Sequence, residues 1–192
     1  MIIYTSKNTM ATDKLKIGDL LPEFTLKNID GKFYSSKEFS TENNVEALII
    51  IFSCNHCPYV KAYEDRIISI QKDYYDRGVR VIAINSNDDT NYPEDSFDEM
   101  IKRSNEKNFN FLYLRDETQA IAKAFGATHT PEVFLFNNEQ KLVYHGKIDD
   151  NWQNPQDVKI NYLRNALEEC LSGKKVQFPE TYSIGCTIKW EK

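Results

Sequence analysis

The stretch that decides the fold is residues 47–63, which read ALIIIFSCNHCPYVKAY. It opens with six apolar residues in a row, a pattern typical of a strand that is buried on both faces of a parallel sheet. We therefore predict a strand over Glu46–Phe52. After the two cysteines, apolar residues recur at spacings of three and four, which predicts a helix from about Asn55 to Asp76. The cysteines thus lie where a buried strand passes into an amphipathic helix.

The pair Cys54 and Cys57 has the spacing and the position of a reactive site. A thiol attacks as its thiolate, and the partial positive charge at a helix N-terminus lowers the pKa of a nearby thiol. Cys54 is the candidate nucleophile, with its sulfur expected to be exposed at the carboxyl edge of the sheet. Cys57 follows one helical turn later, where a disulfide can close. The imidazole of His56 can donate to the Cys54 thiolate or stabilise its charge, which would make the oxidised pair a stronger oxidant.

Two other interpretations of this pair stay open. A Cys-x-x-Cys motif is also half of a zinc site, but zinc usually needs a second pair at similar spacing. The other two cysteines, Cys170 and Cys186, are sixteen residues apart. The pair could also consist of inert core thiols. The position between strand and helix favours the redox interpretation.

The rest of the chain alternates strands with helices, which indicates a wound α/β sheet. Asp30-Gly31 supplies the positive φ of a tight turn, so a leading β-hairpin is predicted around it, and Asn137-Asn138 predicts a second hairpin. The further predicted elements are strands at Val79–Asn85, Phe111–Leu114, Glu132–Asn137 and Lys141–Lys147, and helices from Phe97, over Thr118–Phe125 and over Val158–Leu171.

We expect one domain with an extension at each end. A chain of 192 residues with 41% hydrophobic side chains suffices for one compact core. Residues 1–14 are polar and lack periodicity, so we expect a flexible arm there, followed by the domain over residues 15–173. The tail, residues 174–192, lacks helical periodicity but contains the apolar string SIGCTIKW at 183–190. We therefore predict that the tail is docked on the domain.

The composition disfavours several classes of partner. A formal charge of −5 without a stripe of lysines argues against nucleic acid. The longest apolar run has six residues, whereas a membrane-spanning helix needs about 20. The N-terminal residues lack the basic and apolar regions of a secretory signal, which predicts a cytoplasmic protein. Four cysteines are too few for a disulfide framework, in agreement with a reducing compartment.

Several strings together resemble one protein superfamily. The cysteine stretch, AINSNDD at 83–89, YPEDSF at 92–97, TPEVFLF at 130–136 and SIGCTIKW are similar to the thioredoxin superfamily, in particular its redoxin branch with ResA-like and TlpA-like proteins. The resemblance extends from about Ile17 to Leu171. It implies an α/β thioredoxin-like fold with a central mixed sheet flanked by helices, here with an N-terminal β-hairpin and an extended C-terminal tail. It also implies a thiol–disulfide oxidoreductase.

At the matching positions, the resemblance assigns roles to the site residues. Cys54 is the nucleophile, Cys57 the resolving thiol, and Thr130-Pro131 the cis-proline loop that shapes the substrate groove. The Thr130–Pro131 bond is predicted to be cis, so that the Thr130 backbone can pair with an extended substrate strand. Expected substrates are disulfide-containing proteins or small molecules. An external thiol reductant recycles the pair, and no cofactor is required.

Three positions depart from the family pattern. Thioredoxins carry a buried aspartate where this chain has Leu48, which predicts slow release of mixed disulfides. Peroxiredoxins carry a threonine where this chain has Ile51, so peroxidase activity is not expected. Related proteins of the subgroup carry Cys-Thr-Pro-Asp where this chain has His129 to Glu132. His129 would therefore face the active site in place of a thiol.

Two residues have open roles. His129 is a proton donor, a metal ligand or a surface loop residue. Cys186 is expected near the active site, because Gly185 permits close approach of the docked tail; there it is a third exchange partner, a ligand or a packing thiol. The alternative function is a metal-binding module without redox turnover that uses Cys54, Cys57, His129 and, as a further ligand, Cys186. The acidic clusters Asp88-Asp89, Glu94-Asp95 and Asp149-Asp150 lack the spacing of a calcium loop and are expected to be solvated turns. Structural roles are expected for His145 as a cross-strand partner and for Cys170 as a small buried hydrophobe.

Overall fold

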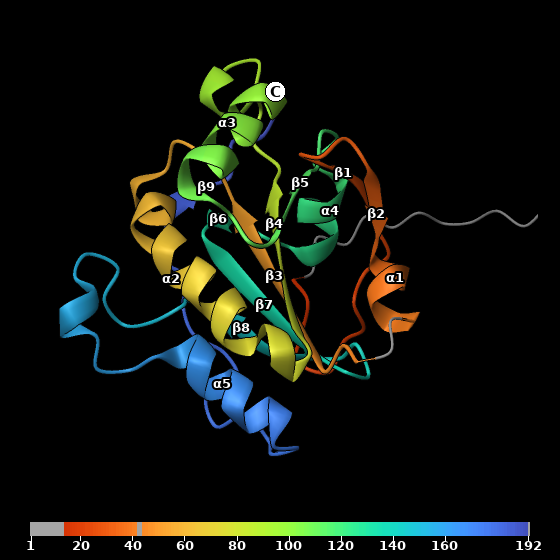
Figure 1. The fold of residues 1–192 in the computed structure, drawn as a ribbon, viewed down its shortest axis with the longest axis vertical. Coiled ribbons are helices and arrows are strands. Elements are labelled where there is room, and N and C mark those ends of the chain that lie inside the picture. Colours follow the sequence, from red (N-terminus) through yellow and green to blue (C-terminus); the bar gives the residue numbers. More distant parts are fainter. Residues whose placement is uncertain (1–13, 42–43, 192) are drawn as a thin grey trace, which may run out of the picture.

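The computed structural model describes residues 14–41 and 44–191, which form an α/β fold around one mixed sheet (Figure 1). The strand order is β2-β1-β5-β4-β3-β7-β8. Strands β3, β4 and β5 are parallel, whereas β1, β7 and β8 run antiparallel to their neighbours. The predicted mixed sheet and N-terminal hairpin are confirmed. The strands are β1 (Thr25–Asn28), β2 (Phe33–Ser35), β3 (Ala47–Ser53), β4 (Val79–Asn85), β5 (Leu112–Arg115), β7 (Glu132–Asn137) and β8 (Leu142–Gly146).

Helices cover both faces of the sheet. Helices α2 and α5 lie on one face and α4 on the other (Figure 1). The arm expected over residues 1–14 lies outside the described residues, apart from Lys14. The helices are α1 (Ser36–Thr41), α2 (Pro58–Tyr74), α3 (Phe97–Lys107), α4 (Ala120–Phe125) and α5 (Tyr162–Leu171).

Two helices start later than the sequence predicts. Helix α2 begins at Pro58 rather than at Asn55, and Cys57 is its N-cap with an extended backbone. The residue before a proline disfavours helical backbone, whereas proline itself fits the first helical position, so the helix opens at Pro58. Helix α5 begins at Tyr162 rather than at Val158, because a separate 3-10 turn at Pro155–Asp157 ends at Val158 in extended backbone.

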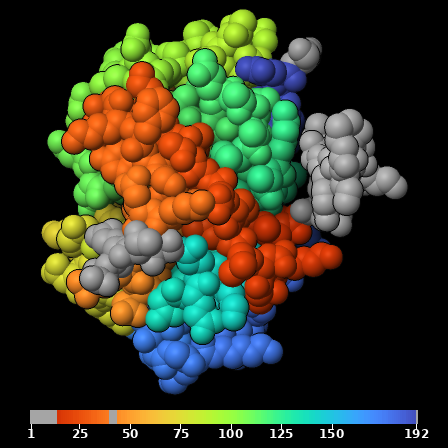
Figure 2. All heavy atoms as spheres, turned by 90° about the vertical axis from the view of Figure 1, so that its right-hand side faces the viewer, coloured from red at the N-terminus to blue at the C-terminus, as the bar shows by residue number. Residues whose placement is uncertain are grey.

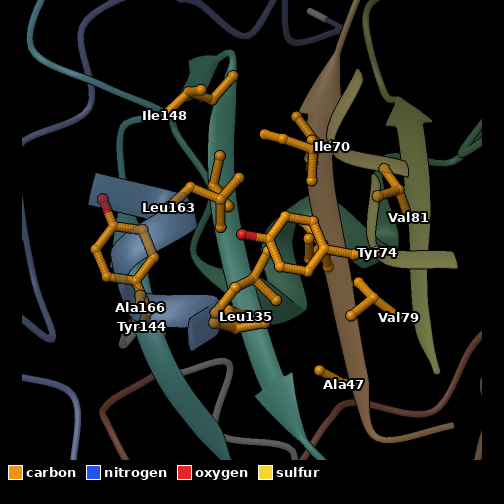
Figure 3. Packing of buried hydrophobic residues seen from close by; sticks show 14 of the residues in the cluster. Ala47, Ile70, Tyr74, Val79, Val81, Leu135, Tyr144, Ile148, Leu163 and Ala166 are labelled. Carbon is orange, nitrogen blue, oxygen red and sulfur yellow. The ribbon is translucent and has the colours of Figure 1, made fainter. Parts of the chain in front are cut away.

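Strand β3 is buried on both faces, as its apolar sequence predicts. Ile49 and Ile51 pack towards α2 and α5, whereas Ile50 and Phe52 pack towards α4. Figure 3 shows the first of these clusters, in which side chains from both helices meet over β7. Each fully buried isoleucine contributes about 1.5–3 kcal/mol of transfer free energy. A well-packed strand therefore holds the residue that follows it, Cys54, in a fixed place.

The N-terminal segment covers the second cluster. Figure 2 shows residues 14–41, in red to orange, running across this face of the molecule. Leu21 and Phe24 of this segment are buried against the α4 side of the sheet. Within residues 14–41 and 44–191, none of the helices has the length and apolar character needed to cross a membrane.

The tail after α5 crosses the domain and pairs with it at several points. The backbone of His145 in β8 exchanges hydrogen bonds with Pro179 and Thr181, at 2.8 and 2.9 Å. Further on, β9 (Cys186–Thr187) pairs antiparallel with β6 (His129–Thr130), beside the top of α2 (Figure 1). Lys189 then bonds to the side chain of Asn87 at 2.9 Å. The tail is thus attached on both sides of Cys186.

Candidate active site

The two sulfurs of the Cys-x-x-Cys motif face the loop before β7. Cys54 follows β3 directly, and its sulfur lies 3.3 Å from the hydroxyl oxygen of Thr130. The Cys57 thiol lies 3.3 Å from the Thr130 carbonyl oxygen and donates to it. The Thr130–Pro131 peptide bond is cis, as predicted. Strand β3, the start of α2 and the cis-proline loop therefore meet at the sulfurs.

Both sulfurs are covered, which the sequence does not predict. Cys54 is 2% exposed and Cys57 is 0% exposed, so the predicted exposure of Cys54 is wrong. The cover is the tail: Thr130 is in register with Cys186, whose side chain packs against the cysteine pair. A Cβ atom on Gly185 would lie 2.2 Å from the Thr130 carbonyl oxygen, so glycine permits this close approach. The expected position of Cys186 near the pair is thus observed.

The surroundings of the two thiols shift their pKa values in opposite directions. Hydrogen bonds from the Cys54 thiol, from Cys186 and from the Val60 N–H lower the pKa of Cys57, although burial opposes them. The contact with Cys57, burial and the nearby carboxylate of Asp95 raise the pKa of Cys54. The sequence predicts the lowered pKa at Cys54. It is found at Cys57 because these hydrogen bonds, including the one from Val60 in the first turn of α2, reach the Cys57 sulfur.

A buried carboxylate, Asp95, clamps the loop between the cysteines. It is 0% exposed, and its two oxygens accept hydrogen bonds from the Asn55 backbone N–H at 2.6 Å and from the side chain of Asn87 at 2.7 Å. The Asn55 side chain donates to the Glu94 carbonyl oxygen at 2.8 Å. The predicted solvated turn at Glu94-Asp95 is therefore wrong for Asp95. The sequence carries no local signal of this role, because the clamp joins segments about forty residues apart.

His56 is held by a contact with Asp95. Its Nδ1 lies 2.6 Å from an Asp95 carboxylate oxygen, and its ring stacks on Tyr92 with centroids 5.5 Å apart. A ring nitrogen of His56 comes within 4.8 Å of the Cys54 sulfur. The sequence predicts that the His56 imidazole donates to the Cys54 thiolate. The ring is positioned instead by the contact with Asp95 and the stacking on Tyr92. Leu48, at the position where thioredoxins carry a buried aspartate, is a buried core side chain. The carboxylate that acts on the pKa of Cys54 belongs to Asp95, in another segment of the chain.

His129 faces away from the sulfurs. Neighbouring residues of a strand point to opposite sides, and Thr130 points to the cysteines. The His129 Nδ1 lies 2.8 Å from the Thr128 hydroxyl, and the ring lines a pocket of about 360 Å³ together with Glu132 and His145. The predicted metal set of Cys54, Cys57, His129 and Cys186 is therefore not assembled. Among the described residues, the ligand atoms that converge belong to Cys54, His56 and Asp95.

Two further acidic residues interpreted as solvated are buried. Asp149 bonds to Arg66 at 2.5 Å and accepts from the Tyr63 hydroxyl at 2.8 Å, which ties the loop after β8 to α2. Asp88 is 3% exposed, and its N–H donates to the tail at the Lys189 carbonyl oxygen, at 2.8 Å. His145, expected as a cross-strand partner, is buried and in register with Phe134.

Comparison with known proteins identifies the family. A family model described as Redoxin matches residues 16–162, which include both cysteines and the cis-proline loop. The chain belongs to the Redoxin family. An uncharacterized conserved protein from Geobacillus kaustophilus is 39% identical, with a TM-score of 0.85 over 92% of this chain and 93% of that chain. No curated protein sequence matched.

Two more distant structures share the fold of this redoxin. A thiol:disulfide interchange protein of the thioredoxin family from Chlorobium tepidum is 17% identical, with a TM-score of 0.61 over 83% of this chain and 99% of that chain. Peroxidoxin BcpB from Mycobacterium tuberculosis is 14% identical, with a TM-score of 0.57 over 82% and 95%. At this identity the likeness concerns the fold, and function has to be argued from the site.

Proposed function

We propose that this redoxin is a thiol–disulfide oxidoreductase in which Cys54 attacks a substrate disulfide and Cys57 resolves the mixed disulfide. The observation that carries the proposal is the meeting of the two sulfurs with Thr130 beside a cis-proline, each sulfur 3.3 Å from a Thr130 oxygen. The substrates are disulfide-containing proteins or small molecules. An external thiol reductant restores the pair, in a reducing, cytoplasmic setting.

The reaction proceeds in two exchanges. The Cys54 thiolate bonds to one substrate sulfur, and the other substrate sulfur leaves as a thiolate. The Cys57 thiolate then attacks the Cys54 sulfur, which releases the second substrate thiolate and leaves a Cys54–Cys57 disulfide. The substrate gains two electrons, and protons from solvent complete its thiols. The protein's and the substrate's sulfurs are the only reacting atoms.

An extended substrate takes the place of the tail at Thr130. Cys186 occupies the strand edge with which such a substrate would pair, and the tail buries both sulfurs. When Cys186 moves away, Cys57 loses two hydrogen bonds that stabilise its thiolate. Displacement of the tail therefore uncovers Cys54 and weakens the preference for charge on Cys57. Both changes favour attack by Cys54.

We infer disulfide exchange rather than peroxide reduction. Ile51, at the position where peroxiredoxins resemble one another in a threonine, is a core side chain with 1% exposure. It offers no hydroxyl group to the cysteine three residues later. Leu48 packs on the other face of the sheet. Neither Ile51 nor Leu48 can donate a hydrogen bond to a peroxide.

Titration of the reduced protein against mixtures of reduced and oxidised glutathione tests the proposal. We expect one two-electron transition, with a Cys54–Cys57 disulfide in the peptide map. The variant Cys170→Ser is the control. It should titrate like the wild type, because Cys170 lies on α5, away from the site. Free thiols at Cys54 and Cys57 at every glutathione ratio would overturn the proposal.

Two substitutions should shift the midpoint of that titration in opposite directions. In His56→Ala, the Asp95 carboxylate loses one of its hydrogen-bond partners and destabilises the nearby thiolate more, so the pair should become more reducing. In Asp95→Asn, the negative charge is removed and the pair should become more oxidising. Each shift amounts to about 30 mV for every 1.4 kcal/mol of thiolate stabilisation. Unchanged midpoints in both variants would contradict this role of the His56–Asp95 pair.

Metal binding is the second candidate function, with a different ligand set from the predicted one. It is favoured by the convergence of Cys54, His56 and Asp95 within 4.8 Å. It is opposed by the four hydrogen bonds that already engage the Asp95 carboxylate oxygens, because a metal ion would have to displace some of them. Elemental analysis after purification in zinc-supplemented medium separates the two: stoichiometric zinc that Cys54→Ser abolishes would favour the metal module.

A further inference from the structure

We propose, on the basis of the proposed function, that Cys186 is a third redox cysteine, which takes over the disulfide of the Cys54–Cys57 pair by bonding to Cys57. The tail is then both the cover of the substrate groove and a participant in the exchange. Of the three roles considered for Cys186, it is thus an exchange partner rather than a ligand or a packing thiol.

The first support is the packing of the three cysteines. The Cys186 side chain packs against Cys54 and Cys57. Cys186 is also in register with Thr130, whose carbonyl oxygen lies 3.3 Å from the Cys57 sulfur. In agreement with this proximity, Cys186 lowers the pKa of Cys57. Cys57 therefore lies between two thiols, Cys54 on its own loop and Cys186 on the tail. In disulfide exchange, the attacking sulfur has to reach the sulfur that is bonded to the leaving one. Here Cys186 would attack Cys57, and Cys54 would leave.

The second support is that the tail is held where this contact is made. Thr130 and Cys186 are paired in β6 and β9, and the Ile188 N–H donates to the Thr128 carbonyl oxygen at 2.9 Å. Between this anchor and the one at Thr181, Tyr182 is 93% exposed. The segment that carries Cys186 is thus fixed at both ends and spans an exposed stretch. This attachment keeps the thiol at a high effective concentration next to Cys57.

The proposed step balances without another reactant. The Cys186 thiolate attacks the Cys57 sulfur of the Cys54–Cys57 disulfide, one S–S bond forms and one breaks, and Cys54 leaves as a thiolate. The proton from the Cys186 thiol ends on Cys54. No electrons are gained or lost, so the step is an isomerisation of the oxidised protein.

The step moves the disulfide towards solvent. Cys54 and Cys57 are buried, whereas Cys186 is half-buried. An external thiol that cannot reach the pair can attack the Cys186 sulfur. The Cys57–Cys186 bond also fixes the tail over Thr130, so the oxidised protein cannot accept a second extended substrate until it has been reduced.

Peptide mapping of the full-length Cys54→Ser variant tests the proposal. The reduced variant is treated with oxidised glutathione, free thiols are alkylated at low pH, and the digest is analysed without reduction. Most of the monomer should carry a Cys57–Cys186 link, because glutathione on Cys57 is displaced by Cys186. A variant that stays glutathionylated at Cys57, with Cys186 free for alkylation, would overturn the proposal. Oxidised wild-type protein should contain the same linked peptide beside the Cys54–Cys57 link.

Gly185→Val, added to Cys54→Ser, tests the geometry without removing a thiol. The new side chain would collide with the Thr130 backbone and push Cys186 away from Cys57. Formation of the Cys57–Cys186 link should slow at least about tenfold, because the effective concentration of Cys186 falls. An unchanged rate would contradict the docked geometry as the source of the link. The control, Cys170→Ser added to Cys54→Ser, changes a side chain on α5 that packs on the cluster between α2 and α5, away from the site, and should leave the rate unaltered.

A Cys186→Ser variant separates this inference from the proposed function. It lacks the third thiol but keeps the pair, so it should still form a Cys54–Cys57 disulfide with oxidised glutathione. If it does, and Cys54→Ser forms no link to Cys186, only the role of Cys186 fails. If neither disulfide forms in any variant, the proposed function fails as well.

Discussion

Cys54→Ser should lose disulfide reduction almost completely, by about a thousandfold or more in turnover with a small disulfide substrate. The serine hydroxyl fits the space near the Thr130 hydroxyl but stays protonated at neutral pH and forms no disulfide. The measurement is the rate at which the variant, supplied with an excess of thiol reductant, cleaves a chromogenic aromatic disulfide.

The same assay distinguishes the roles of the two cysteines. Cys57→Ser keeps the attacking sulfur and should react once, releasing one equivalent of aromatic thiol before it stops. The structure makes this a sharp test, because in the covered form the pKa of Cys57, not that of Cys54, is lowered. A burst in Cys54→Ser and none in Cys57→Ser would reverse the assignment and make Cys57 the nucleophile. Cys170→Ser should retain the wild-type rate.

The second large effect concerns stability at low pH and involves Glu132, directly after the cis-proline. Burial raises the pKa of its carboxyl group, but hydrogen bonds from His145, from the Thr128 and His129 N–H groups and the charge of Lys14 outweigh burial and lower it to about 2. A carboxyl group whose folded pKa lies below its unfolded value of 4.5 stabilises the fold above pH 4.5.

This stabilisation should disappear as the pH falls from about 5 to 2. A shift of about 2.5 units corresponds to about 3 kcal/mol in the free energy of unfolding. Glu132→Gln should therefore be less stable than the wild type at pH 7, and the difference should shrink as the pH falls. Urea denaturation from pH 7 down to pH 3 measures it. Glu139→Gln, an exposed surface change, is the control and should show a much smaller difference. A constant difference across this range would contradict the assigned pKa.

The elements that position the site could be predicted where local patterns determine them. The apolar run of β3 is buried on both faces, and Asp30-Gly31 turns the first hairpin, because strand burial and turn conformation are encoded within a few residues. The predicted start of α2 is three residues too early, because the apolar stripe begins only at Tyr59 and Pro58 takes the first helical position, which leaves residues 55–57 outside the helix. The N-cap of α2 is therefore Cys57, whereas the predicted start at Asn55 places it at Cys54.

The parts of the site that were missed depend on contacts between distant segments. Asp95 looks like a surface turn residue in the sequence, but the Asn55 and Asn87 groups that surround it make its burial possible. His129 was expected at the sulfurs because it precedes Thr130, whereas strand alternation turns it to the opposite side. The location of Cys186 could be expected from Gly185 and the apolar tail, but its contact with Cys57 required the pairing of β6 with β9.

The most direct test of the central claim is to trap the mixed disulfide on Cys57→Ser. The purified variant is incubated with glutathione disulfide, alkylated, and its mass and peptide map are determined. We predict one glutathione per chain, bonded to Cys54, while Cys170 and Cys186 remain free. An adduct on Cys186 instead of Cys54, or no adduct while the wild type forms its Cys54–Cys57 disulfide, would contradict Cys54 as the nucleophile of this redoxin.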